Sequence, residues 1–201
     1  MQRGFIEILY LMKCKLITSI FFSKSRLIRL PIDVRGKKGI NFGKNLTTGK
    51  YCRLESFSKD GNKTLFFGTN VQINDFVHIN ALKNVKIGDN VLIASKVFIT
   101  DLEHGSYKGD EYDSVPDSIV KDRDLSSHDV IIEDNVWIGE MVSILPGVTI
   151  GKNSIIGSNS VVTKSIPENC IAVGNPAKIV KQYNFETHEW EKCKNSGGYF
   201  D

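Results

Sequence analysis

The side chain best suited to acid–base chemistry is that of His104, at the start of a polar segment, in the sequence Thr100-Asp101-Leu102-Glu103-His104-Gly105. An imidazole titrates near neutral pH and can therefore take the proton of an attacking hydroxyl group, an effect typically worth about 10²–10⁴ in rate. Asp101 or Glu103 could orient the ring through its second nitrogen, and a backbone carbonyl would serve equally. From residue type alone, His104 could be a general base or a solvated loop histidine without a role.

The cysteines do not form a recognisable site. They are scattered without a Cys-x-x-Cys pair, which argues against a zinc knuckle or a disulfide framework and favours reduced thiols in a cytoplasmic protein. No serine or cysteine nucleophile motif accompanies them. The four cysteines are Cys14, Cys52, Cys170 and Cys193.

The elements that must position His104 follow a six-residue period. An aliphatic residue recurs at every sixth position over 132–162, and shorter runs precede it at 67–79 and 87–99. Six is neither a multiple of 3.6 nor simple alternation, so the period predicts short strands joined by sharp corners and stacked coil upon coil. A β-sandwich would instead show spacings of about eight to twelve residues. The expected inward positions are Ile132, Ile138, Ile144, Ile150, Ile156 and Val162, with Phe67, Ile73, Ile79, Ile87, Ile93 and Ile99 upstream.

The period is interrupted twice. It slips between Ile79 and Ile87, and it stops across 101–129, where the sequence is polar and rich in Asp, Ser and Lys. A loop of this length in a compact domain is usually functional or disordered. We therefore expect a long loop over 101–129 that helps to set specificity.

Several segments resemble the hexapeptide-repeat acyltransferases, in particular the sugar O-acetyltransferases related to maltose and galactoside acetyltransferases. Thr48-Gly49, 52–55 and His104-Gly105-Ser106-Tyr107 resemble more narrowly the lipopolysaccharide and capsule O-acetyltransferases. The likeness covers essentially everything after residue 30. The broader segments are 87–94, 135–139, 146–151, 162–167 and 174–178.

The resemblance implies an all-β fold built on a left-handed parallel β-helix. The expected parts are an N-terminal amphipathic helical segment over 1–32, the β-helix over 33–180 with its loop at 101–129, and a short C-terminal helix and tail over 181–201. It also implies a homotrimer in which each donor groove needs two subunits.

For function, the resemblance implies an acetyl-CoA-dependent O-acetyltransferase that acts on a sugar hydroxyl in lipopolysaccharide O-antigen or capsule biosynthesis. His104 is then the general base for direct transfer in a ternary complex, and Asn74, His78 and Asp101 are the expected acceptor contacts. Lys178 and Lys181 stand where some relatives have arginine, which weakens bidentate phosphate binding. The expected acetyl-CoA contacts are Trp137, Gly139, Ser158, Thr163, Lys164, Lys178 and Lys181.

Other functions remain open at this stage. The acceptor could be a small free sugar or a nucleotide-linked sugar, and the chain could be a β-helix scaffold without catalysis. A zinc enzyme resembling the γ-class carbonic anhydrases would need two histidines five positions apart, and Gly109 lies five positions after His104. We therefore expect no metal. We also expect no nucleic-acid partner.

The first fifty residues are strongly basic, with eleven Lys and Arg residues against two acidic ones. Two apolar runs, 5–12 and 16–22, are separated by Lys13-Cys14-Lys15, too early for a comfortable membrane span. An amphipathic helix remains. It could contact the anionic inner face of the cytoplasmic membrane, or it could cap the open end of the β-helix, and the two roles are compatible.

Overall fold

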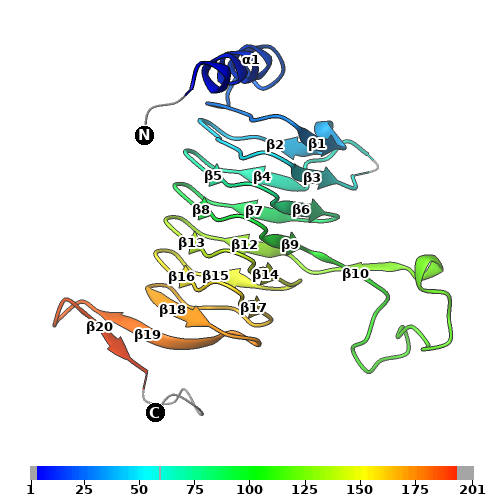
Figure 1. The fold of residues 1–201 in the computed structure, drawn as a ribbon. Coiled ribbons are helices and arrows are strands. Elements are labelled where there is room, and N and C mark those ends of the chain that lie inside the picture. Colours follow the sequence, from blue (N-terminus) through cyan, green and yellow to red (C-terminus); the bar gives the residue numbers. More distant parts are fainter. Residues whose placement is uncertain (1–3, 59, 194–201) are drawn as a thin grey trace.

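The computed structural model, which describes residues 4–58 and 60–193, shows a three-sided parallel β-helix (Figure 1). The strands stack in three sheets that we call sides A, B and C. Side A contains β5 (Gln72–Ile73), β8 (Leu92–Ile93), β13 (Trp137–Ile138), β16 (Ile155–Ile156) and β18 (Cys170–Val173). Side B contains β1 (Ile32–Arg35), β3 (Cys52–Ser56), β6 (His78–Ala81), β9 (Phe98–Thr100), β14 (Ser143–Ile144) and β17 (Val161–Val162). Side C contains β2 (Ile40–Asn41), β4 (Leu65–Phe67), β7 (Val85–Ile87), β12 (Val130–Ile132) and β15 (Thr149–Ile150).

The six-residue period marks the core. Every expected inward position, from Phe67 to Val162, is at most 3% exposed. In-register pairs such as Ile79 with Ile99 stack like residues on successive coils. Burying one such side chain stabilises the fold by about 1.5–3 kcal/mol relative to leaving it in water. The period therefore predicted both the coils and their interior correctly.

Asparagine ladders hold the corner that precedes side A. Asn135 donates a side-chain hydrogen bond to Asn153 at 3.2 Å, and Asn153 donates one to Asn169 at 2.8 Å. All three residues have φ between 57° and 60°, in the left-handed region that most L-residues avoid. Asparagine suits this corner because it tolerates the backbone and its amide both donates and accepts.

Replacing Asn153 with alanine is expected to lower the free energy of unfolding by about 1–3 kcal/mol, since it strains the backbone and removes two ladder hydrogen bonds. Asn153→Gly removes the same bonds without the strain and should cost about 1 kcal/mol less. Denaturant unfolding of both variants measures the difference. Equal losses for the two variants would show that the positive φ carries no energetic weight.

The loop at 101–129 is more ordered than expected. It begins and ends as an antiparallel pair, β10 (Leu102–His104) and β11 (Leu125–Ser127), and contains a single 3-10 turn, η2 (Val120–Asp122). Figure 1 shows this hairpin extending away from the coil stack. The expectation of a long insertion here is confirmed, and its base is a short two-stranded sheet.

The N-terminal segment is helical only in its first part. Helix α1 (Phe5–Phe21) lies across the N-terminal end of the coils (Figure 1), and a 3-10 turn, η1 (Lys37–Gly39), follows β1. Leu27 already pairs with Thr47 as a parallel bridge, and Ile28 is fully buried. The helical expectation for all of 1–32 is therefore wrong after Phe21, because residues from about 27 onward join the coils.

The expected helix in 181–201 is also wrong for the described residues. β19 (Lys178–Asn184) turns back antiparallel along β18 and pairs with β20 (Glu189–Lys192). Tyr183 packs between Phe185 and Trp190, with ring centroids 5.0 and 5.3 Å away. The open edge of β18 offers backbone partners that a helix would leave unpaired. The remaining tail, 194–201, lies outside the described residues.

Over 4–58 and 60–193, no helix has the length and apolar character needed to cross a bilayer.

Candidate active site

His104 is the last residue of β10 and is exposed to solvent. No hydrogen bond to its ring is recorded within the described part of the chain. Its backbone carbonyl accepts a hydrogen bond from the hydroxyl group of Tyr107. The imidazole is thus free to meet a substrate, while the backbone that carries it is fixed.

Arg123 holds this arrangement together, a role that the sequence did not reveal. Its guanidinium donates to the Tyr107 hydroxyl at 2.7 Å and to the side chain and carbonyl of Ser118 at 2.8 and 2.9 Å. Since Tyr107 in turn contacts the carbonyl of His104, the position of the imidazole depends on a chain of contacts that begins at Arg123.

Asp101 does not face the loop. It is fully buried, and its carboxylate oxygens accept hydrogen bonds from the backbone N–H groups of Leu82, Lys83 and Asn84, each at 2.8 Å. These three residues form the widened corner that causes the phase slip before Ile87. The carboxylate presents no surface to a substrate or to His104, so the structure contradicts its expected acceptor role and gives it a structural one.

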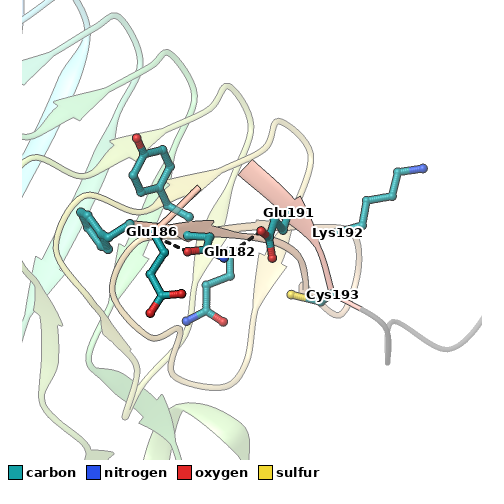
Figure 2. Close-up of a pocket in the computed structure, with 8 residues that line it drawn as sticks. Gln182, Glu186, Glu191, Lys192 and Cys193 are labelled. Carbon is teal, nitrogen blue, oxygen red and sulfur yellow. Dashed lines mark hydrogen bonds between the residues drawn. The ribbon is translucent and has the colours of Figure 1, made fainter. Parts of the chain in front are cut away.

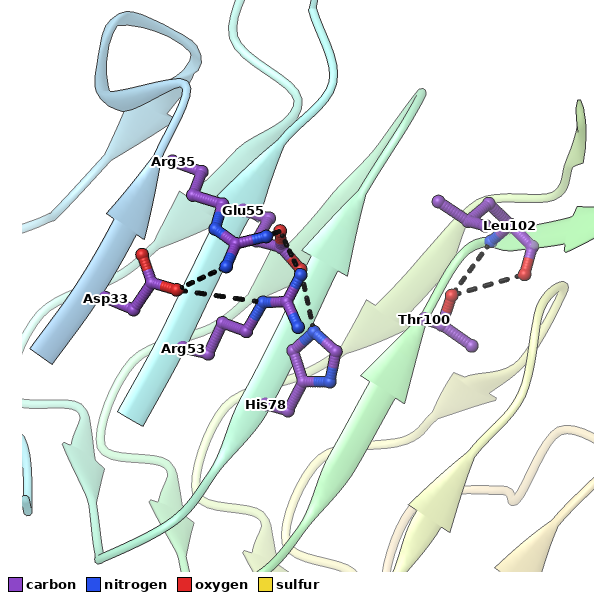
Figure 3. Close-up of polar contacts among 7 residues, drawn as sticks. All are labelled: Asp33, Arg35, Arg53, Glu55, His78, Thr100 and Leu102. Atoms are coloured by element: carbon purple, nitrogen blue, oxygen red, sulfur yellow. Dashed lines mark hydrogen bonds and ion pairs between the residues drawn. The ribbon is translucent and has the colours of Figure 1, made fainter. Parts of the chain in front are cut away.

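A polar cluster lies on the outer surface of side B, where successive strands bring together Asp33, Arg35, Arg53, Glu55 and His78 (Figure 3). The Glu55 carboxylate accepts hydrogen bonds from Arg53 at 2.8 Å, Arg35 at 3.2 Å and His78 Nε2 at 2.8 Å. The Glu55 side chain is only 4% exposed, whereas that of His78 is 32% exposed. No role for Glu55 was predicted from the sequence. The register of β3 and β6 pairs Arg53 with His78 and places Glu55 two positions further along the same face.

The protonation of this cluster follows from its contacts. Burial raises the pKa of Glu55, but hydrogen bonds and charge from Arg53 and His78 outweigh it, and the pKa lies below the ordinary value. An ionised carboxylate can only accept, so Nε2 of His78 carries a proton. The half-buried His78 ring then has its other nitrogen, Nδ1, to offer to a ligand.

Asn74 lies at the edge of the prism between sides A and B. Its backbone N–H donates to the carbonyl of Ile93, in the corner directly after β5. Gly49 packs beneath it: a Cβ at that glycine would lie 2.4 Å from the Asn74 carbonyl carbon. The Cys52 thiol donates to the Asn74 carbonyl at 3.1 Å. Burial raises the pKa of Cys52 to about 11, so this thiol is not a nucleophile at neutral pH.

The residues expected to bind acetyl-CoA do not form one cluster in the single chain. Gly139 and Ser158 continue the A–B edge beyond Asn74, where the Gly139 N–H donates to Ile156 and a Cβ would lie 2.6 Å from the Ser158 nitrogen. Trp137 is 50% exposed on side A. The exposed residues Thr163 and Lys164 follow β17 at the opposite edge of side B, and Lys178 and Lys181 lie on β19.

Asn74 and His104 lie on different edges of the same prism. The strands of side B separate the corner of Asn74 from the base of β10, a distance of about 15 Å at about 3.3 Å per residue. β10 then carries His104 further outward, and Figure 1 shows β5 and β10 on opposite sides of the stack. The two side chains of one chain therefore cannot contact the same sugar hydroxyl.

Other features lie apart from these edges. A hollow of about 550 Å³ on the β19–β20 hairpin (Figure 2) contains none of the expected acceptor or donor residues. It is lined by Gln182, Tyr183, Asn184, Phe185, Glu186, Glu191, Lys192 and Cys193.

Among residues 4–58 and 60–193, no group of three or more His, Cys, Asp or Glu side chains is arranged to hold a metal ion.

Comparison with known proteins identifies the family. Residues 129–164 match the family model "Bacterial transferase hexapeptide (six repeats)". The chain is 47% identical over 190 residues to "Putative lipopolysaccharide biosynthesis O-acetyl transferase WbbJ" of Escherichia coli, covering 94% of each chain. The chain belongs to the hexapeptide-repeat acyltransferases.

Two further relatives are consistent with this family. The galactoside O-acetyltransferase of Escherichia coli is 39% identical over 124 residues, covering 59% of this chain and 57% of the relative. The N-acyltransferase AntD of Bacillus cereus, solved with coenzyme A and dTDP-4-amino-4,6-dideoxyglucose, superposes with a TM-score of 0.66 at 22% identity, covering 82% of this chain and 84% of AntD. This likeness supports the fold, the left-handed parallel β-helix.

Proposed function

We propose that this hexapeptide-repeat acyltransferase transfers an acetyl group from acetyl-CoA to a sugar hydroxyl in lipopolysaccharide O-antigen or capsule biosynthesis. The observation that carries the proposal is the similarity to WbbJ, which spans 94% of both chains, whereas the match to the galactoside enzyme covers 59% of this chain. The exposed imidazole of His104 supports it, because sugar hydroxyls need a base.

His104 acts as the general base. Its imidazole takes the proton of the sugar hydroxyl while the oxygen attacks the thioester carbonyl carbon. A carbon–oxygen bond forms, the carbon–sulfur bond breaks, and the departing thiolate takes the proton from the imidazolium. The products are the acetylated sugar and free coenzyme A. No cysteine or serine intermediate is required, in agreement with the raised pKa of Cys52.

The active site combines two chains of a homotrimer. Because Asn74 and His104 occupy different edges of one prism, a complete site needs the A–B edge of one subunit and the extended hairpin of a neighbour. A closed ring of three prisms repeats this contact three times. The acceptor is then bound by the amide of Asn74 and by Nδ1 of His78, both of which suit hydroxyl groups.

The same intersubunit groove holds acetyl-CoA. Gly139 and Ser158 place small residues on the A–B edge in line with Asn74, which suits the narrow pantetheine arm. Lys164, Lys178 and Lys181 supply positive charge for the phosphates, and Trp137 and Thr163 complete the expected contacts. Lysines attract phosphate as point charges without the bidentate geometry of arginine.

Replacing Arg123 with alanine should lower kcat about 10- to 100-fold and leave the KM for acetyl-CoA within about twofold, because the base loses its support while the donor groove is unchanged. Lys121→Ala, on the same loop, is the matched control and should retain full activity. Steady-state kinetics in both substrates measures the split. A rise in the acetyl-CoA KM with an unchanged kcat would show that Arg123 serves the donor instead.

The proposed function is tested by incubating purified protein with acetyl-CoA and a panel of acceptors, with free thiol release as the readout. The panel contains free sugars, nucleotide-linked sugars, lipid-linked oligosaccharides and polymer. Turnover that requires a polysaccharide precursor supports the proposal. Preferential turnover of free or nucleotide-linked sugars would replace it with the alternative acceptor class, and no release with any acceptor would favour a scaffold.

A further inference from the structure

Helix α1 has two faces with different surroundings. One face packs on the first coil: Cys14 and Thr18 are fully buried, and Thr18 Oγ1 accepts a hydrogen bond from the backbone N–H of Ile28 at 2.8 Å. The opposite face is also apolar but lies in solvent. We call its five residues, which are 49–74% exposed, the α1 stripe; they are Phe5, Leu9, Met12, Leu16 and Ile20.

The α1 stripe is not needed to cap the β-helix. The buried face already covers the first coil where α1 lies across the end of the stack (Figure 1), and the stripe, on the opposite face of the helix, is exposed to solvent. Five large apolar side chains on one exposed face are unusual for a surface helix, which normally turns charged and polar residues to water. Such a face marks an interaction site.

The width of the exposed apolar surface favours a bilayer over another helix. At about 100° per residue, the stripe together with Ile6 and Ile8, which are 82% and 45% exposed, covers a sector of about 160°. A partner helix in a coiled coil covers a narrower seam of two positions in each heptad. A helix lying in the plane of a membrane buries a broad face of this kind among the lipid chains.

The charges around the stripe select the type of lipid. Lys13 and Lys15 flank it on the helix, and Lys24 and Arg26 are exposed in the segment that follows. The only acidic residues among the first fifty are Glu7 and Asp33. Basic side chains at the edge of an inserted apolar face complement anionic headgroups. Other exposed basic residues at the same end are Lys37, Lys38 and Lys44.

From this geometry we propose that α1 docks the enzyme on the surface of a bilayer that contains anionic phospholipid. The α1 stripe inserts below the headgroups, and the flanking lysines and arginine contact them. The helix lies flat and does not cross the membrane. Docking leaves the three sides of the prism, and so the proposed active site, free.

The test is flotation of the full-length protein with vesicles of phosphatidylglycerol and phosphatidylcholine, compared with vesicles of phosphatidylcholine alone. We expect at least tenfold more bound protein on the anionic vesicles, falling as salt is raised. Leu9→Glu/Leu16→Glu should lower binding at least tenfold. Phe185→Glu, which changes an equally exposed apolar residue at the other end of the molecule, should bind like the wild type.

Leu9→Ser/Leu16→Ser provides a milder second variant, and thermal unfolding with acetyl transfer to a soluble acceptor shows that each variant is folded. Equal binding by wild type and stripe variants would overturn the proposal, as would equal binding to both kinds of vesicle. Light scattering measures the size of the assemblies that the wild type and the stripe variants form. If the wild type ignores vesicles and the stripe variants form smaller assemblies, the stripe contacts a second copy and the membrane proposal is wrong.

Discussion

His104→Ala is expected to lower kcat about 10²- to 10⁴-fold with little change in the KM for acetyl-CoA. The reason is that a sugar hydroxyl is a poor nucleophile until its proton is being removed, and general base catalysis by a placed imidazole contributes a factor of this size. Stopped assays of coenzyme A release at saturating acetyl-CoA measure the loss. The fold should be unaffected, because His104 is exposed to solvent.

His188→Asn is the matched histidine control, since His188 lies in the turn of the C-terminal hairpin with φ 56° and asparagine tolerates that backbone. It should turn over like the wild type. His104→Ala protein with the parental rate would refute the base assignment, and attention would pass to His78, whose ring is already oriented by Glu55.

Mixed assemblies of Asn74→Ala and His104→Ala chains should be more active than either parent. Loss of the Asn74 amide removes acceptor hydrogen bonds and should lower kcat/KM about 10- to 100-fold, and loss of His104 removes the base. In a trimer that contains both variants, about one site in three pairs an intact Asn74 with an intact neighbouring His104. Such assemblies should show roughly a third of the wild-type rate.

The experiment uses two affinity tags, one on each variant, so that only mixed assemblies are purified after co-expression. A mixture of parents assembled separately is the control and should show only the residual activity of the parents. If Asn74 and His104 worked within one chain, the doubly tagged protein would be no more active than the average of its parents. That result would also contradict the separation of the two prism edges as the reason for a shared site.

Much of the fold could be predicted because each position of the six-residue repeat requires a particular type of residue. An inward isoleucine followed by a small residue recurs along the coils, and an asparagine recurs at the corner before side A; Ile138, Gly139 and Asn135 each lie where that rule places them. The ends could not be predicted in this way, because there tertiary pairing overrides local preference. Residues 178–184 form a strand because they pair with the edge of β18, and Ile28 is buried in the first coil.

The candidate site was only partly predictable, since its side chains are assembled across coils. His104 and Asn74 can be placed by counting hexads. The burial of Asp101 depends on the widened corner at 82–84, and the phase slip there was the available signal that extra backbone N–H groups needed a partner. Arg123 lies in an aperiodic segment, where sequence spacing carries no information about contacts.

The narrow neck of the β10–β11 hairpin has a consequence for how acceptor preference can diversify. Leu102 pairs with Ser127, and the backbone N–H of His128 donates to the carbonyl of Asp101 at 2.9 Å, so the insertion leaves and rejoins the stack at one point. The coils on either side keep their register across it: β7 pairs with β12 and β9 with β14. Residues 105–124 can thus be exchanged without disturbing the register of the coils, provided that the contacts of Tyr107 and Arg123 are kept. If this loop sets acceptor preference as we expect, grafting a relative's segment there would change the preferred sugar.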